Sequence, residues 1–177
     1  MKHFAILYPM EVILYTDGSS RGNPGPGGWG AILLTKDIVK ELGGRDNATT
    51  NNRMELMATI KGLEEVHKLQ TNGQKLKTLT VKTDSEYVKK GITDWIAGWL
   101  ARGWKTAAKK PVLNQELWQA LYNEKKKIEA GSTKVEFVYV KAHAGIVLNE
   151  RADTIATTFA DKEPTQLYDG TRAGYMV

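Results

Sequence analysis

The 177-residue chain contains no cysteine, which excludes a disulfide scaffold and a thiolate metal site and is typical of a reducing compartment. Long apolar runs are also absent: stretches such as 12–15 are far shorter than the roughly 18 residues that a membrane span needs. The first ten residues show no leader peptide with a small-residue cleavage site. Charged residues make up 25% of the chain and apolar residues 41%, so wholesale disorder is excluded. We expect a globular, cytoplasmic protein with no membrane partner.

The chain shows no internal boundary. Its length fits one domain, and no repeat or low-complexity linker divides it. We therefore predict a single domain over residues 1–160. Residues 161–177 are polar and rich in turn-forming residues, which indicates a loosely attached tail. No heptad pattern or obvious apolar patch is present, and we expect a monomer.

The order of predicted elements indicates an α/β fold. Strands are predicted at 12–16, 29–34, 38–42, 79–83 and 135–140, and helices from 52, at 86–90, 93–100 and 114–130, and from 149. Residues 21–28 are rich in glycine and proline and predict a turn, and Asn114 is a candidate N-cap. Three meandering strands followed by strand–helix alternation predict a mixed five-stranded sheet with helices packed on it.

Four acidic residues occupy positions where catalytic groups gather in α/β domains, namely the ends of strands and the starts of helices. Asp17 and Asp84 are predicted to end strands, and Glu55 and Asp153 to lie in the first turns of two helices. If the strands of Asp17 and Asp84 are parallel neighbours, these side chains emerge side by side. Each acid alone has a simpler interpretation as a turn residue, a helix cap or an acid stabilised by the helix dipole.

A cluster of four carboxylates would be unfavourable without a cation, because like charges repel. Hard oxygen ligands without cysteine suit Mg²⁺ or Mn²⁺. Two such ions can clamp a phosphodiester for attack by water. His143, in a loop rich in glycine and alanine just before the helix of Asp153, is a candidate proton shuttle, although a surface histidine explains the spacing equally well.

Positive charge is concentrated in one segment. Residues 102–127 contain seven Lys or Arg and two Glu. The net charge of this segment is therefore +5, the same as the net charge of the whole chain. Four of the five tryptophans lie in or just before this segment. Basic residues interleaved with aromatic ones indicate binding of nucleic acid. The alternative is a solvated helical face whose tryptophans belong to the core.

Five linked motifs resemble bacterial type 1 ribonuclease H. They are residues 15–19, 22–28, 50–56 and 83–85, and His143 with 149–153, and they occur in the order and spacing of that family from about 11 to 160. The resemblance implies a ribonuclease H-like sheet of three antiparallel and then two parallel strands, with helices on both faces. It also implies hydrolysis of the RNA strand of RNA–DNA hybrids, leaving 5′-phosphate and 3′-hydroxyl ends.

The resemblance implies roles for individual residues. Asp17, Glu55, Asp84 and Asp153 match the metal-binding carboxylates, which hold two Mg²⁺ ions in the substrate complex, and His143 matches an auxiliary catalytic histidine. The implied substrate-binding residues are Asn23, Thr50, Asn51, Asn52, Arg53, Glu86, Trp95, Trp99, Lys105, Lys109 and Lys110. Glu86 departs from the glutamine often found at its position. No base-edge code is evident, so we predict little sequence specificity.

Two other functions are compatible with this fold. The first is another two-metal nuclease, against which the continuous motifs argue. The second is a non-catalytic module that binds hybrids, which predicts the loss of a carboxylate, whereas all four are present.

Overall fold

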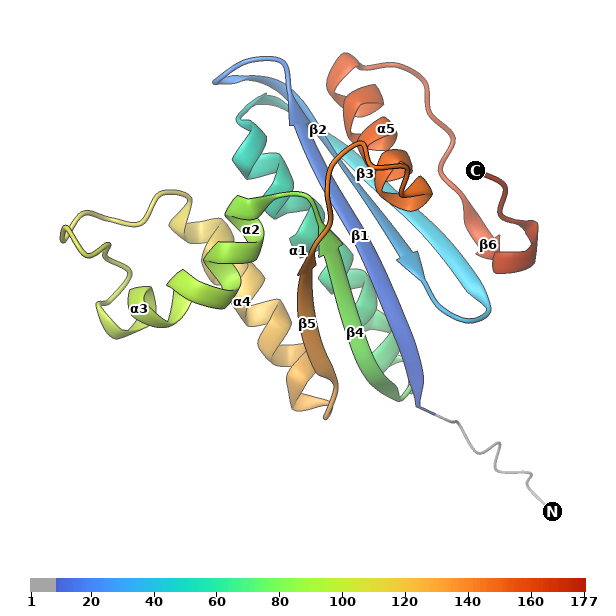
Figure 1. The fold of residues 1–177 in the computed structure, drawn as a ribbon, viewed down its shortest axis with the longest axis horizontal. Coiled ribbons are helices and arrows are strands. Elements are labelled where there is room, and N and C mark those ends of the chain that lie inside the picture. Colours follow the sequence, from blue (N-terminus) through green and yellow to red (C-terminus); the bar gives the residue numbers. More distant parts are fainter. Residues whose placement is uncertain (1–8) are drawn as a thin grey trace.

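The computed structural model describes residues 9–177 and forms a mixed sheet with helices on both faces (Figure 1). The strands are β1 (Met10–Ser20), β2 (Gly25–Leu34), β3 (Ile38–Thr49), β4 (Leu76–Thr83), β5 (Lys134–Tyr139) and β6 (Asp169–Thr171). The helices are α1 (Asn51–Thr71), α2 (Glu86–Lys90), the π-helix η1 (Gly91–Trp95), α3 (Ile96–Ala101), α4 (Gln115–Ala130), α5 (Val147–Asp161) and the 3₁₀ turn η2 (Arg172–Gly174).

The strand order is β5-β4-β1-β2-β3-β6. Strands β1, β2 and β3 are antiparallel, and β4 and β5 run parallel to β1, as the resemblance implies. The prediction of five strands is wrong by one, because the C-terminal segment returns to the sheet and pairs β6 with the edge of β3.

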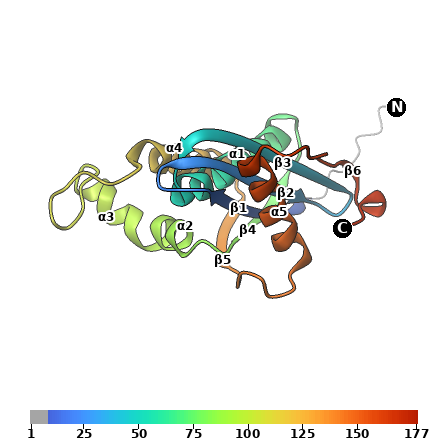
Figure 2. The same ribbon diagram turned by 90° about the horizontal axis from the view of Figure 1, so that it is seen from above.

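Strand β1 shows why both faces of the sheet are covered. Its side chains alternate between the two faces. Val12 and Leu14 belong to the core under α1 and α4, and Ile13 and Tyr15 belong to a second core under α5. The continuous apolar run of β1 is therefore the signature of a strand buried on both sides (Figure 2).

Helix α5 lies directly on the backbone of the sheet. A Cβ atom on Gly28 would approach the carbonyl oxygen of Ala156 to 2.2 Å, and one on Gly30 would approach that of Ala152 to 2.4 Å. The prediction that the whole of 21–28 is a turn is therefore wrong beyond residue 24, because the glycines from Gly25 onward form strand β2. In β2 the role of these glycines is to leave a flat surface on which α5 packs closely, and not to adopt positive φ angles as in a turn.

The segment after α5 is folded, and the expectation of a loosely attached tail is not met. Ile38 pairs with Thr171, and Lys40 pairs with Asp169. Leu167, Tyr168 and Tyr175 pack against the core under α5. The prediction of a tail rested on the many polar residues of this segment and gave too little weight to these three apolar and aromatic side chains.

Residues 86–113, which comprise α2, η1, α3 and the loop that follows, form an arm that projects to the left in Figure 1. The two predicted short helices are one continuous helical stretch through Gly91. Residue 91 is a glycine because a side chain there would collide with the ring of Trp118. Asn114 precedes α4 as predicted, but it has a φ of 58° and its side chain does not cap the helix. Its amide instead donates to the hydroxyl of Tyr87.

Among residues 9–177, no helix combines the length and the apolar composition that crossing a membrane requires. The start of the chain, for which we predict no leader peptide, lies mostly outside the described residues.

Candidate active site

Asp17 and Asp84 lie side by side because their strands are parallel neighbours. The last paired residues of β1 and β4 are Thr16 and Thr83, and each aspartate is the next residue in its chain. Asp84 follows the end of β4 as predicted. Asp17 lies inside β1 instead of ending it, since β1 continues beyond β4 and pairs Asp17 with Gly30 of β2. The predicted juxtaposition is confirmed.

Glu55 reaches the same place because α1 crosses β1 at a glycine. A Cβ atom on Gly18 would lie 2.2 Å from the backbone nitrogen of Glu55, so only glycine allows this close approach. Helix α1 begins at Asn51, where the hydroxyl of Thr50 accepts from the backbone N–H of Arg53. Glu55 therefore lies in the second turn, not the first as predicted.

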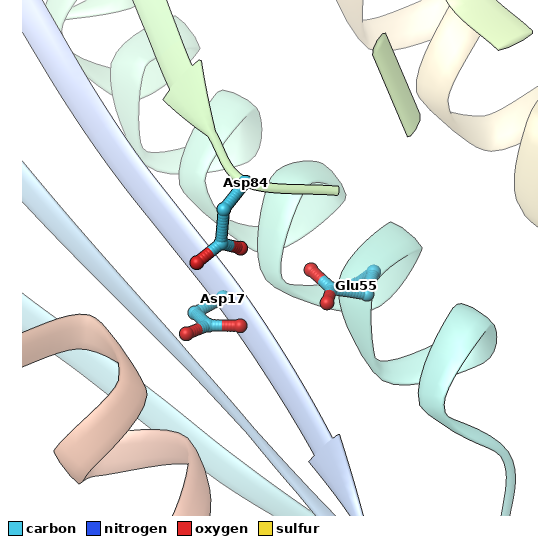
Figure 3. Close-up of side chains that lie close together, drawn as sticks. All are labelled: Asp17, Glu55 and Asp84. Carbon is cyan, nitrogen blue, oxygen red and sulfur yellow. The ribbon is translucent and has the colours of Figure 1, made fainter. Parts of the chain in front are cut away.

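Asp17, Glu55 and Asp84 point toward one another in Figure 3. Each offers a carboxylate oxygen, and these oxygens lie within 4.8 Å of one another. Burial raises the pKa of Asp17 to about 8, with further contributions from the charges of Asp84 and Asp153, although the N–H of Gly18 donates to its carboxylate at 2.7 Å. Burial, and then the charges of Asp17 and Asp84, raise the pKa of Glu55 well above its usual value.

These residues fit a divalent cation. Glu55 is buried, Oε1 accepts from the amide of Asn51 at 3.3 Å, and Oε2 has no hydrogen-bond partner among the described residues. A buried carboxylate oxygen without a partner is costly, and a cation would satisfy it. The donor set consists entirely of carboxylate oxygens, which suits a hard ion. The three side chains can therefore bind a metal ion.

Asp153 is near the cluster but outside it. It lies on α5 and is the only one of the four predicted carboxylates that does not belong to the group within 4.8 Å. Its charge nevertheless contributes to the raised pKa of Asp17. Because α5 begins at Val147, two residues earlier than predicted, Asp153 lies in the second turn.

Asn149 is a site residue that the sequence reasoning missed. It is buried on α5, one turn before Asp153, and its amide donates to Oδ2 of Asp84 at 2.9 Å. Its position four residues before Asp153, on the same helix face, was the available signal. The second missed residue, Gly18, could be identified only once the crossing of β1 and α1 was known.

His143 lies in the predicted loop between β5 and α5. It is exposed, with a φ of 50°. The loop is attached to α5 by the N–H of Gly145, which donates to Oε1 of Glu150 at 2.9 Å. His143 therefore sits immediately before the helix that carries Asp153.

A polar groove of about 420 Å³ lies beside the start of α1. Its lining residues are Ser20, Asn23, Thr50, Asn51, Asn52, Leu113 and Asn114. Four of the predicted substrate-binding residues are therefore brought together. Arg53 does not line the groove: its guanidinium donates to Oδ1 of Asn114 at 3.1 Å and to Oε1 of Glu116 at 2.6 Å.

The remaining predicted substrate residues lie on the arm. Trp95 is 38% exposed, whereas Trp99 is only 9% exposed and packs against the ring of Trp118 at 5.2 Å. The structural interpretation of the tryptophans thus applies to Trp99. Glu86 is exposed and paired with Lys90 at 2.5 Å. Lys105, Lys109 and Lys110 are exposed, and none forms an ion pair with any residue of 9–177.

The sequence is similar to a family and to named bacterial proteins. Residues 9–161 match the model of the RNase H family. Ribonuclease H of Paramagnetospirillum magneticum is 53% identical over 148 residues, which cover 84% of this chain and 88% of that protein. Ribonuclease HI of Caulobacter vibrioides is 50% identical over 148 residues, covering 82% of this chain and 90% of that protein.

Solved structures of ribonucleases H share the fold. LC9-RNase H1, a type 1 RNase H with the type 2 active-site motif, is 28% identical with a TM-score of 0.75, covering 92% of this chain and 79% of that one. LC11-RNase H1, solved in complex with an RNA/DNA hybrid, is 26% identical with a TM-score of 0.63, covering 85% of this chain and 97% of that one. With the carboxylate cluster at the end of the parallel strands, these similarities establish that the chain belongs to the ribonuclease H family.

Proposed function

We propose that this chain is an endoribonuclease that hydrolyses the RNA strand of RNA–DNA hybrids in the cytoplasm, as a monomer that uses Mg²⁺ and reads little sequence. The observation that carries the proposal is the group formed by the buried Asp17 and Glu55 and the half-buried Asp84, in a chain about half identical to bacterial ribonucleases H. The products carry 5′-phosphate and 3′-hydroxyl ends.

Asp17, Glu55, Asp84 and Asp153 would hold the metal ions. When bound, two Mg²⁺ ions would activate the attacking water and stabilise the leaving 3′-oxygen. The amide of Asn149 orients the carboxylate of Asp84 by a hydrogen bond. Gly18 allows α1 and β1 to approach closely enough for Glu55 and Asp17 to share the site.

His143 assists proton transfer at the leaving 3′-oxygen or the release of the product. Its exposed position on the loop before α5 leaves the imidazole free to reach a bound phosphodiester. Because His143 holds no metal ion, its role is auxiliary. Loss of the imidazole is therefore less damaging than loss of a metal-binding carboxylate.

Substrate selection rests on the polar groove and the arm. Amide and hydroxyl groups of Asn23, Thr50, Asn51 and Asn52 can donate to and accept from 2′-hydroxyls, which only the RNA strand carries. On the arm, the exposed ring of Trp95 and the three exposed lysines offer a stacking surface and phosphate contacts to the DNA strand. LC11-RNase H1, of the same fold, has been solved with a hybrid bound.

The proposal is tested by incubating the protein with four substrates, each labelled on one strand: an RNA–DNA hybrid, duplex RNA, duplex DNA and single-stranded RNA. We expect cleavage of the RNA of the hybrid alone, with 5′-phosphate ends on the fragments. Cleavage of duplex DNA would assign the chain to another nuclease class. Binding of the hybrid without cleavage in Mg²⁺ or Mn²⁺ would leave only a hybrid-binding module.

A further inference from the structure

The carboxylate of Glu41 on β3 is buried at the centre of a hydrogen-bond network and has no role in the proposed mechanism. Its side chain is 1% exposed and accepts four hydrogen bonds. Arg151 donates two of them, from Nε at 2.7 Å and Nη2 at 2.9 Å. The other two come from the C-terminal segment: the N–H of Tyr168 at 3.0 Å and the hydroxyl of Tyr175 at 2.7 Å.

Tyr168 and Tyr175, which supply the last two bonds, belong to a C-terminal segment, residues 165–175, that we call the strap. The strap runs along the edge of β3 through β6. The rings of Tyr168 and Tyr175 lie 4.9 Å apart, and the backbone N–H of Glu41 donates to the carbonyl of Tyr168 at 2.7 Å. The strap lies beyond residues 9–161, which match the family model.

Through Glu41, the strap is connected to the helix of the fourth carboxylate. Arg151 lies on α5 two residues before Asp153, and its Nη2 also donates to the carbonyl of Gln166 in the strap at 3.3 Å. The glycines of β2 and β3 allow Ile155 and Phe159 of α5 to lie against the sheet, which sets the height of the helix. The bidentate ion pair of Arg151 with Glu41 adds an attachment near the start of α5 that opposes rotation of the helix.

We infer that the strap and Glu41 fix the orientation of α5 and thereby place Asp153 against the metal site. Tyr175 and Glu41 are positioning residues, because the side chain of neither residue belongs to the metal site, and both act on it through Arg151 and α5. The inference rests on the proposed function of that site. It predicts that weakening the bonds between the strap and Glu41 lowers metal affinity while leaving the affinity for the hybrid unchanged, since the groove and the arm lie on other elements.

Tyr175→Phe in the full chain tests the inference, with Tyr168→Phe as its matched control. Each substitution removes one phenol hydroxyl from the same pair of rings, but the hydroxyl of Tyr168 bonds the carbonyl of Thr171 and not Glu41. The readouts are Mn²⁺ binding to the substrate-free protein by calorimetry, the Mg²⁺ concentration for half-maximal cleavage, and KM for the hybrid. Mn²⁺ binding reports on the strap even if no substrate is cleaved, so failure of the proposed function is distinguishable.

For Tyr175→Phe we expect Mn²⁺ affinity to fall about tenfold, near the lower end of the effect of one hydrogen bond to a charged group, with an unchanged KM. Tyr168→Phe should bind Mn²⁺ like the unmodified protein. In an Asp153→Asn background, Tyr175→Phe should have no further effect on Mn²⁺ affinity, because the strap acts through Asp153. Equal losses in the two tyrosine variants, no loss in either, or a full effect in the Asp153→Asn background would overturn the inference.

Discussion

Three acidic side chains with oxygens within 4.8 Å of one another make the centre of this protein costly to fold without a cation. The pKa of Asp17 is raised from 3.8 to about 8, chiefly by burial and then by the charges of Asp84 and Asp153. An acid whose pKa is higher in the folded state binds its proton more tightly there. Its contribution to stability is therefore complete below about pH 4 and is lost as the pH rises toward 8.

Asp17→Asn should consequently stabilise the metal-free protein at pH 8. We expect a gain of about 5 kcal/mol in the free energy of unfolding, because the pKa is raised from 3.8 to about 8 and one pKa unit corresponds to about 1.4 kcal/mol. At pH 4 the gain should vanish. The measurement is urea unfolding with a chelator at both pH values. Asp37→Asn, at an exposed turn, is the control and should change neither value. An unchanged stability of Asp17→Asn at pH 8 would contradict the electrostatic argument.

We expect Glu116 to compete with the substrate for the positive charge of Arg53. It holds the guanidinium of Arg53 at 2.6 Å, beside the polar groove, and both side chains are partly exposed. Glu116→Gln should release Arg53 for phosphate, tighten hybrid binding about twofold to threefold at low salt and steepen its salt dependence. Glu124→Gln removes the same charge from α4, where Glu124 pairs with Lys127, and serves as the control. Equal effects of both variants on the dissociation constant would rule out this competition.

The four carboxylates could be predicted from the sequence because the ends of strands and starts of helices are visible in its periodicity. Three of them are brought together, and Asp153 is placed nearby. Asn149 and Gly18 could not be predicted by the same reasoning, because their importance arises from contacts between elements. The pairing of Arg53 with Glu116 likewise depends on the crossing of α1 and α4, which local sequence does not encode.

At the level of elements, the packing of α5 on β2 determines how far Asp153 stands from the sheet. Gly30→Ala would place a Cβ atom 2.4 Å from the carbonyl oxygen of Ala152, so α5 must shift. We expect a loss of about 2–4 kcal/mol in the free energy of unfolding and a loss of cleavage activity larger than the change in KM. Thermal and chemical unfolding, with steady-state kinetics, provide the measurements.

Gly98→Ala is the matched control for this prediction. The atoms nearest to a Cβ atom there belong to the guanidinium of Arg102, the far end of an exposed, flexible side chain, and alanine favours a helix by about 1 kcal/mol. Its stability should therefore be unchanged or slightly raised. If Gly30→Ala were as stable and active as Gly98→Ala, the close packing of α5 would not determine the position of Asp153.

Element boundaries show where sequence periodicity was sufficient. The helix over 114–130 and the strand over 135–140 were predicted within a residue or two, because the first has a helical period and the second is rich in valine and aromatic residues. Strand β6 was missed because it has only three residues, and pairing with β3 rather than its own pattern stabilises it. The glycines of β2 suggested a turn, since the sequence alone does not show the helix that packs on them.

For the whole molecule, the basic segment predicted from composition extends over the arm and α4, and only part of it is available to a polyanion. Lys125 and Lys126 are both paired with Glu129, whereas Lys105, Lys109 and Lys110 are exposed on the arm. Substituting the three arm lysines with glutamine should weaken hybrid binding and reduce the slope of log affinity against log salt by up to about 3.

The control is a triple variant with the same change in net charge, in which Lys125, Lys126 and Lys134 become glutamine. Each of these lysines is paired with a glutamate, and we expect the salt slope to stay nearly constant. Fluorescence anisotropy of a labelled hybrid at several salt concentrations measures both slopes. Equal reductions would show that overall charge, and not the arm, governs binding.

The central claim is that Asp17, Glu55 and Asp84 hold the metal ions that cleave the RNA of a hybrid. Its most direct test is a Mg²⁺ titration of the cleavage of a hybrid labelled on the RNA strand, by the unmodified protein and by Asp17→Asn. We predict cleavage that requires Mg²⁺ and falls at least about 1000-fold in the variant, while hybrid binding is retained. Cleavage in the presence of chelator, or an Asp17→Asn variant as active as the unmodified protein, would contradict the claim.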